Sequence, residues 1–144
     1  MPGVSPDLIA VYRATVYRVG GIDFRIDVAA PALDALLTTH DVAQAAFITA
    51  YNPFSEPRGN AENVAANARL AADLDAAGFS RMAGEGIDPS GQWQAEASFL
   101  VFGLSRPQAI ALAKKYGQAG FVFLRRGFPP ELALAPFEDL PHPG

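Results

Sequence analysis

The order of apolar and helical segments in the middle of the chain limits the folds that this sequence can adopt. Apolar or alternating strand patterns and two helical patterns follow one another at 45–50, 60–77, 80–87, 93–102, 105–116 and 121–124. Asn60 is the predicted N-cap of the first helix and Gly78 its stop, and Ser105 is the predicted cap of the second. The segment 45–50 is apolar on both faces, which is typical of a central strand. The order strand, helix, strand, strand, helix, strand predicts an α+β fold.

A β-hairpin is predicted ahead of this unit. Residues 12–19 and 22–28 are rich in aromatic and β-branched side chains, and Gly20-Gly21 separates them by the two residues that a tight turn prefers. Pro31 favours the start of a short helix over 32–37. The whole pattern predicts an N-terminal hairpin followed by a ferredoxin-like βαββαβ unit, a mostly antiparallel sheet with its helices on one face.

One domain accounts for the 144 residues, a length that buries about two-thirds of the unfolded surface in a single core. We expect this α+β domain to span residues 1–128. Residues 129–144 hold five of the twelve prolines and are predicted to form an extended Pro-rich tail that docks Leu132, Leu134 and Phe137 on the surface.

Composition excludes several function classes. The chain has no cysteine, which rules out disulfides and thiolate chemistry, and its net charge of −4 disfavours nucleic acid and anionic membranes as partners. No stretch reaches the ~20 apolar residues of a membrane span. The two histidines, His40 and His142, are dispersed, and Gly84-Glu85-Gly86 lacks the third glycine of a dinucleotide fingerprint. We therefore expect a cytoplasmic protein without a metal or cofactor.

Polar side chains converge at one end of the predicted sheet. Right-handed crossovers place the strand 93–102 beside the strand 45–50 and antiparallel to it, so that Tyr51 and Asn52 lie near Glu96 and Ser98. The first helix begins at that end and the second finishes there, close to Gln118. The loop that follows Asn52 is therefore the predicted position of a polar site.

Two asparagines strengthen this prediction. Asn63 and Asn67 share a helical stripe with Leu70 and Leu74, and this stripe must face the core. An amide buried without partners costs ~1–3 kcal/mol for each lost group, so something polar must meet these side chains. Two interpretations remain open: a structural network that holds the loop 52–59, or a site for a small polar molecule. Replacing Asn63 and Glu96 would abolish binding without changing the melting temperature in the second case, and would collapse the fold in the first.

The predicted ligand-binding residues are Tyr51, Asn52, Ser55, Asn60, Asn63, Asn67, Arg69, Ser98 and Gln118. Arg58 or Arg69 is available for a carboxylate or phosphate, although Arg69 is also placed to pair with Asp73 four residues on. Whether the chain is an enzyme is left open; if it is, Glu96 is the predicted general acid or base, because burial raises the pKa of a carboxyl. Trp93 either stacks on a ligand or covers the core.

A second hypothesis belongs to a different class. Helices on one face of a sheet leave the other face to be covered by the hairpin, a partner or a second copy of the chain. The protein would then be an interaction or regulatory module, dimeric through its sheet, with the Asn/Glu cluster purely structural.

The chain also resembles a bacterial family, the domain of unknown function 3293. The resemblance rests on the segments 49–53 (Thr-Ala-Tyr-Asn-Pro), 93–99 (Trp-Gln-Ala-Glu-Ala-Ser-Phe) and 117–118 (Gly-Gln), and on the spaced Asn60, Asn63 and Asn67. These are the segments that the topology brings together, so the resemblance implies one shared site. The family has no established activity, and the resemblance therefore implies no reaction. This chain has Ala97 where the family pattern often has a proline.

Overall fold

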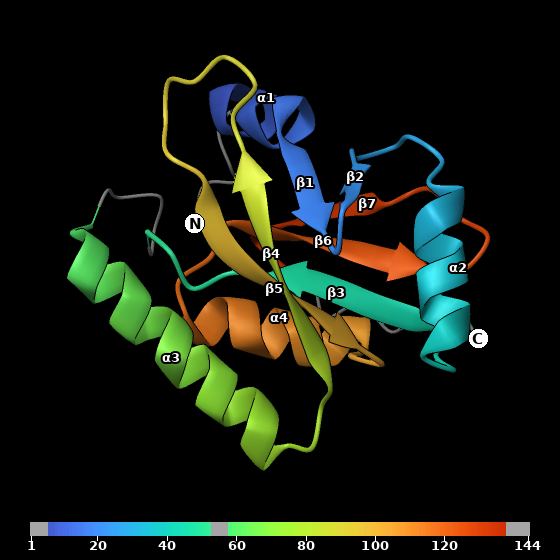
Figure 1. Ribbon diagram of the computed structural model, residues 1–144. Coiled ribbons are helices and arrows are strands. Elements are labelled where there is room, and N and C mark those ends of the chain that lie inside the picture. Colours follow the sequence, from blue (N-terminus) through green and yellow to red (C-terminus); the bar gives the residue numbers. More distant parts are fainter. Residues whose placement is uncertain (1–5, 53–57, 138–144) are drawn as a thin grey trace.

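The computed structural model describes residues 6–52 and 58–137. Within these residues the chain forms an α+β fold of four helices and one antiparallel sheet of seven strands, in the order β2-β1-β4-β5-β3-β6-β7 (Figure 1). The strands are β1 (Val16–Val19), β2 (Ile22–Phe24), β3 (Gln44–Ile48), β4 (Arg81–Ile87), β5 (Glu96–Phe102), β6 (Gly120–Arg125) and β7 (Glu131–Leu134). The helices are α1 (Pro6–Ala14), α2 (Pro31–Thr39), α3 (Asn60–Ala76) and α4 (Arg106–Lys115). None of these helices has both the length and the apolar character of a transmembrane span.

Strand β3 separates two cores, as its continuous apolar sequence predicts. Ala46 and Ile48 pack with buried side chains of α3 and α4 on what we call the outer face of the sheet. Ala45 and Phe47 pack with buried side chains of α2, β1 and β2 on the inner face. The prediction of helices on one face only is therefore wrong for α2, because this helix and the hairpin cover the face opposite α3 and α4.

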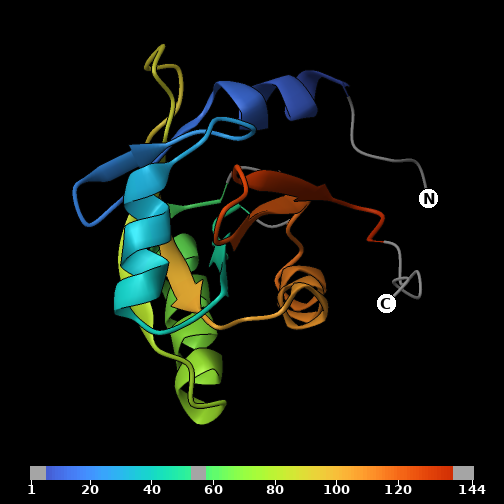
Figure 2. The same ribbon diagram turned by 90° about the vertical axis from the view of Figure 1, so that its right-hand side faces the viewer.

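The sheet curls into a half-barrel around its inner face. The Asp27 amide, which follows β2, donates a hydrogen bond of 2.8 Å to the carbonyl of Pro130, which precedes β7. The two ends of the sheet are thus tied together. Figure 2 shows α1 near the top of the molecule, above β7, with the β1–β2 hairpin to its left. This helix extends over the open side of the half-barrel.

The amino-terminal strand prediction is wrong over its first residues. Residues 12–14 form the end of α1, and β1 begins only at Val16. Thr15 ends the helix, since its amide and its hydroxyl both donate to the carbonyl of Val11, at 3.0 and 2.6 Å. The aromatic and β-branched side chains of this segment favour a strand, but their packing against the half-barrel selects a helix.

The hairpin itself is confirmed. Gly20 and Gly21 have φ angles of 54° and 77°, the positive values that a two-residue turn of this kind requires. Strand β2 is shorter than predicted and ends at Phe24, and Asp27, with a φ of 65°, takes a left-handed conformation that a strand cannot contain.

The regular structure continues beyond Pro129-Pro130, where the sequence predicts that it ends. Residues 131–134 form β7, which pairs antiparallel with β6. Leu132 packs against the inner core and Phe137 against the outer core, so these side chains dock as expected, although Leu132 does so from a strand.

Helix α4 begins with the predicted cap at Ser105, and this cap gives a testable contribution to stability. The Ser105 hydroxyl accepts a 3.2 Å hydrogen bond from the Gln108 amide, and the Gln108 side chain accepts one of 2.9 Å from the Ser105 amide. Ser105→Ala is expected to lower the free energy of unfolding by about 1 kcal/mol in urea denaturation. Ser80→Ala, at an exposed serine before β4, is the control and should change it by less than about 0.5 kcal/mol. Equal losses in the two variants would show that the capping box contributes nothing.

Candidate functional site

The chain that leaves β3 is held by two buried asparagines of α3. The Asn67 side chain is 7% exposed; its carbonyl accepts from the Ala50 amide at 2.8 Å and its amide donates to the Ala97 carbonyl at 2.9 Å. The Asn63 side chain is 6% exposed; it accepts from the Asn52 amide at 2.8 Å and donates to the Asn52 side-chain oxygen at 2.9 Å. The side-chain oxygen and nitrogen of both asparagines are therefore hydrogen-bonded to neighbouring protein groups, as in a structural network.

Asn52 connects this network to Glu96. Its φ of 47° is a left-handed conformation that asparagine tolerates better than most residues. Its side-chain oxygen accepts from the Arg58 amide at 2.9 Å as well as from Asn63. Its side-chain amide donates to Oε2 of Glu96 at 2.7 Å. Asn52 therefore joins the two ends of the segment 52–58 and orients the carboxylate.

Glu96 opens β5 and is half-buried. Burial raises the pKa of its carboxyl above the ordinary 4.5, and the hydrogen bond from Asn52 opposes this shift only in part. Burial raises the pKa values of the Tyr12 and Tyr17 hydroxyls, and the negative charge of Glu96 adds to both shifts. These effects place the carboxylate in a poorly hydrated region shared with two phenol rings.

That region is a cavity of about 250 Å³ on the inner face, at the end of the half-barrel where β3 finishes and β5 and β6 begin. Its wall combines apolar side chains with a few polar ones, which is typical of a small-molecule site. The described lining residues are Leu8, Val11, Tyr12, Thr15, Tyr17, Phe47, Thr49, Tyr51, Asn52, Gly86, Trp93, Glu96, Ser98, Gln118, Ala119, Gly120, Phe121 and Val122.

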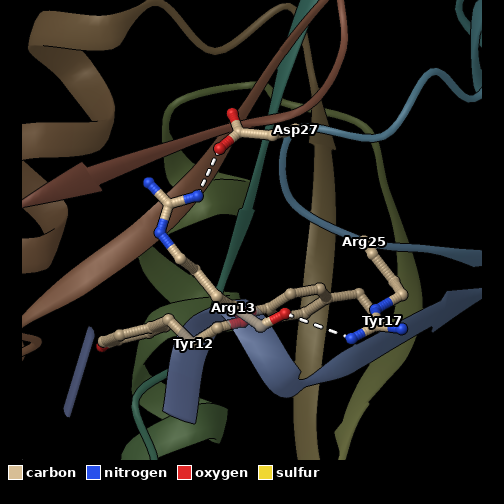
Figure 3. A network of polar contacts seen from close by, with 5 residues as sticks. All are labelled: Tyr12, Arg13, Tyr17, Arg25 and Asp27. Atoms are coloured by element: carbon tan, nitrogen blue, oxygen red, sulfur yellow. Dashed lines mark hydrogen bonds and ion pairs between the residues drawn. The ribbon is translucent and has the colours of Figure 1, made fainter. Parts of the chain in front are cut away.

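Helix α1 forms one side of the cavity and is attached by polar contacts to β1 and to the residues that follow β2. Figure 3 shows Arg13 paired with Asp27, and the Arg25 side chain donating to the Arg13 carbonyl at 3.5 Å. The Tyr17 hydroxyl donates to the Tyr12 carbonyl at 3.1 Å. Because α1 has no buried residue of its own, these contacts and the half-buried Tyr12 position it over the cavity.

The structure brings Tyr51, Asn52, Glu96, Ser98 and Gln118 to this cavity. These five residues lie at or next to the ends of β3, β5 and α4, so the predicted convergence of polar side chains at one end of the sheet is observed for them. The Gln118 side-chain amide donates to the carbonyls of Tyr51 and Tyr116, at 3.0 and 3.2 Å, and so fixes the end of α4 against the chain after β3.

Other predicted residues lie elsewhere. Asn60 is exposed and is the first residue of α3, because Gly59 occupies the N-cap position, and Ser55 lies outside the described residues. Arg69 lines a separate groove between α3 and α4, where Asp73 pairs with Lys115 at 2.7 Å and accepts from the Tyr116 hydroxyl at 2.5 Å. Across residues 6–52 and 58–137, no three His, Asp or Glu side chains gather as a metal site.

A family model described as a protein of unknown function, DUF3293, matches residues 48–120. The chain belongs to this family. No curated protein and no solved structure gives a significant match. The matched segment runs from the end of β3 to the start of β6, so it contains both the asparagine network and Glu96.

The DUF3293 segment forms only part of the cavity wall. Tyr12 of α1, Tyr17 of β1 and Thr15 between these elements lie before the match and contribute to the same wall as Glu96. The sequence did not identify these three residues as site residues, because the strand predicted over 12–19 left no helix to cross the half-barrel. Ala97, where the family pattern often has a proline, lies in regular pairing with Glu85 of β4.

Proposed function

We propose that this DUF3293 chain is a cytoplasmic domain that binds a small polar molecule in the inner-face cavity, with Glu96 as its charged anchor. The observation that carries the proposal is the state of the Glu96 carboxylate. One oxygen accepts from Asn52, and the other has no hydrogen-bond partner among residues 6–52 and 58–137. A half-buried carboxylate oxygen inside a largely apolar wall is stabilised best by a ligand that donates to it.

The asparagines have a supporting role in this proposal. Asn63 and Asn67 hold the chain after β3, Asn52 orients Glu96, and none of the three needs a ligand to satisfy its side chain. If the bound molecule is also transformed, the raised pKa of Glu96 suits it to accept or donate a proton at the free oxygen. The chemistry would then depend on the same atom as the binding.

A variant that fills the cavity tests the proposal. The φ of Gly86 lies outside the left-handed region, and a Cβ on it would meet Thr15 at 3.6 Å and Tyr17 at 3.9 Å, ordinary contact distances. Gly86→Leu should therefore project its side chain into the cavity without backbone strain. Ala83→Leu, at an exposed position of the same strand, is the matched control.

The measurement is a thermal-shift screen of polar metabolites against the three proteins. A ligand present at a hundred times its dissociation constant adds about 2.7 kcal/mol to stability. We expect at least one compound to raise the melting temperature of the wild type and of Ala83→Leu but not of Gly86→Leu. Equal stabilisation of Gly86→Leu, or no stabilising compound in a broad panel, would contradict the proposal.

For the fold, we propose that β3, α3, β4, β5, α4 and β6 form a ferredoxin-like core to which the hairpin, α1, α2 and β7 are added. The strand order β4-β5-β3-β6 and the antiparallel pairing support it. The alternative function, a module dimeric through an open sheet face, has less support because α2 and the hairpin cover the inner face. Light scattering after size-exclusion chromatography tests it, since a monomer would exclude such a dimer.

A further inference from the structure

The chemistry of the cavity wall restricts the class of ligand, provided that the cavity binds one as proposed above. Glu96 is the only charged side chain among the described lining residues, which include no lysine, arginine or histidine. Arg69, which the sequence offered for a carboxylate or phosphate, lies in the separate groove between α3 and α4. An anionic ligand in the cavity would face the Glu96 carboxylate without any described cation in the wall to compensate it.

Hydrogen-bond donors in the wall are largely used by the protein itself. Both hydrogens of the Gln118 amide go to the carbonyls of Tyr51 and Tyr116, and the Ser98 hydroxyl donates to the Glu96 carbonyl at 3.0 Å. After these bonds, Gln118 keeps its side-chain oxygen and Ser98 its lone pairs. Both residues therefore offer acceptors to a ligand.

Three other hydroxyl groups in the cavity wall also donate their hydrogen to the protein itself. Thr15 donates to the Val11 carbonyl at 2.6 Å, Thr49 to the Ala97 carbonyl at 2.7 Å and Tyr17 to the Tyr12 carbonyl at 3.1 Å. A hydroxyl has one hydrogen, so each of these groups has only acceptor capacity left; that of Thr49 is partly used, because its oxygen already accepts from the Tyr51 backbone amide at 3.1 Å. These acceptors, grouped with the Glu96 carboxylate, are complementary to a ligand rich in N–H donors.

Aromatic side chains supply the rest of the recognition. Tyr12, Tyr17, Phe47 and Trp93 line the cavity together with Glu96. The faces of aromatic rings attract cations, and this attraction strengthens where water is excluded. The donors that remain in the wall, such as the indole N–H of Trp93, belong to uncharged groups and cannot neutralise an anion.

We propose that the ligand of this cavity is a small organic cation, an ammonium or amidinium group on a flat or apolar body. Its N–H groups donate to the free oxygen of Glu96 and to the side-chain oxygen of Gln118, and its body lies against the aromatic rings. The cavity of about 250 Å³ limits it to a small molecule. Charge selectivity follows from the carboxylate, and shape selectivity follows from the rings.

Three probes of one shape and different charge test this assignment: benzamidinium, benzamide and benzoate. Their affinities are measured by titration calorimetry and ligand-observed NMR with the wild type, Glu96→Gln, Glu85→Gln and Gly86→Leu. Glu85 lies on β4, pairs with Arg18 at 3.9 Å and does not line the cavity, so Glu85→Gln removes one charge outside the site. In Glu96→Gln the side-chain oxygen still accepts from Asn52, which preserves the orientation.

We expect benzamidinium to bind the wild type and Glu85→Gln at least tenfold more tightly than benzamide, and benzoate not to bind. Glu96→Gln should lose at least tenfold in affinity for benzamidinium and little for benzamide, and Gly86→Leu should bind neither. If benzamide or benzoate binds as tightly as benzamidinium and Gly86→Leu abolishes that binding, the cation assignment is overturned while the cavity remains a binding site. If none of the probes binds, or if Gly86→Leu binds benzamidinium like the wild type, the cation assignment fails; the metabolite screen then decides separately whether the cavity binds any ligand.

Discussion

Asn67→Ala is expected to lower the free energy of unfolding by about 2–4 kcal/mol in urea denaturation followed by circular dichroism. The Asn67 side chain is buried and supplies the hydrogen-bond partner of the Ala50 amide. Its removal leaves that amide unpaired beside the core, which costs about 1–3 kcal/mol, and the lost side-chain volume adds to this. The Ala97 carbonyl loses less, because it still accepts from Thr49.

Asn67→Asp keeps the shape of the side chain and changes its hydrogen bonds, so it distinguishes the contribution of the hydrogen bonds to stability from that of side-chain volume. At neutral pH the aspartate keeps an acceptor for Ala50 but places a buried negative charge against the Ala97 carbonyl, so the variant should be at least as unstable as Asn67→Ala. Below its pKa the carboxylic acid has one donor and one acceptor, as asparagine does, and part of the stability should return. Asn60→Ala, at the exposed start of α3, is the control and should change the stability by less than about 0.5 kcal/mol. A loss no larger than the control's would contradict the framework role of Asn67.

Unlike the Asn67 variants, Glu96→Gln is expected to lose much of its affinity for benzamidinium and none of its stability at pH 7. Because burial raises the pKa of Glu96 in the folded state, the folded protein binds this proton more tightly than the unfolded chain does. The stability contributed by this group is therefore present in full below the ordinary pKa of 4.5 and is lost as the pH rises through the folded pKa. Glutamine stays neutral and does not incur this loss.

The difference between the two unfolding free energies isolates this effect. The Asp23, Asp73 and Asp88 carboxyls have pKa values lowered by their hydrogen-bond partners and act in the opposite direction, but they are present in both proteins. We expect the advantage of Glu96→Gln to grow as the pH rises above 4.5 and to level off once Glu96 is ionised in the wild type. A flat difference, or an advantage of Glu96→Gln that is smaller at pH 7 than at pH 4, would contradict the burial of a charged carboxylate.

The different results expected for Asn67 and Glu96 depart from the sequence-based prediction, which gave the asparagines and the glutamate the same role. The sequence placed Asn63, Asn67 and Glu96 in one site and expected Asn63 and Glu96 to behave alike on substitution. In the structure α3 packs on the outer face, whereas Ser98 alternates with Leu100 and Phe102 onto the inner face. Periodicity identifies the residues that share a face of an element, but it does not identify the face of the sheet that each helix covers.

The parts that could be predicted are those that local chemistry determines. Ser105 and Gly78 mark helix ends through a capping box and a φ of 82°, and Gly20-Gly21 sets the hairpin turn. The approach of Tyr51, Asn52 and Gln118 to Glu96 follows from strand order and crossover handedness, which few topologies satisfy.

The parts that could not be predicted depend on contacts between distant segments. Residues 6–14 carry side chains that suit a strand as well as a helix, and their position across the half-barrel decides between them. Strand β7 is flanked by prolines and forms because β6 offers it an edge. The aromatic side of the cavity depends on both the curl of the sheet and the placement of α1, so Tyr12 and Tyr17 carried no signal of a site in the sequence.

A crystal structure of the protein grown with benzamidine would show whether Glu96 anchors a cation in the inner-face cavity. We predict electron density for the amidinium within hydrogen-bonding distance of the free oxygen of Glu96, with the phenyl ring against the aromatic wall and the Asn52, Asn63 and Asn67 bonds unchanged. Density for the probe in the groove between α3 and α4, or a bound amidinium directed away from Glu96, would contradict the assignment of this carboxylate as the anchor of the site.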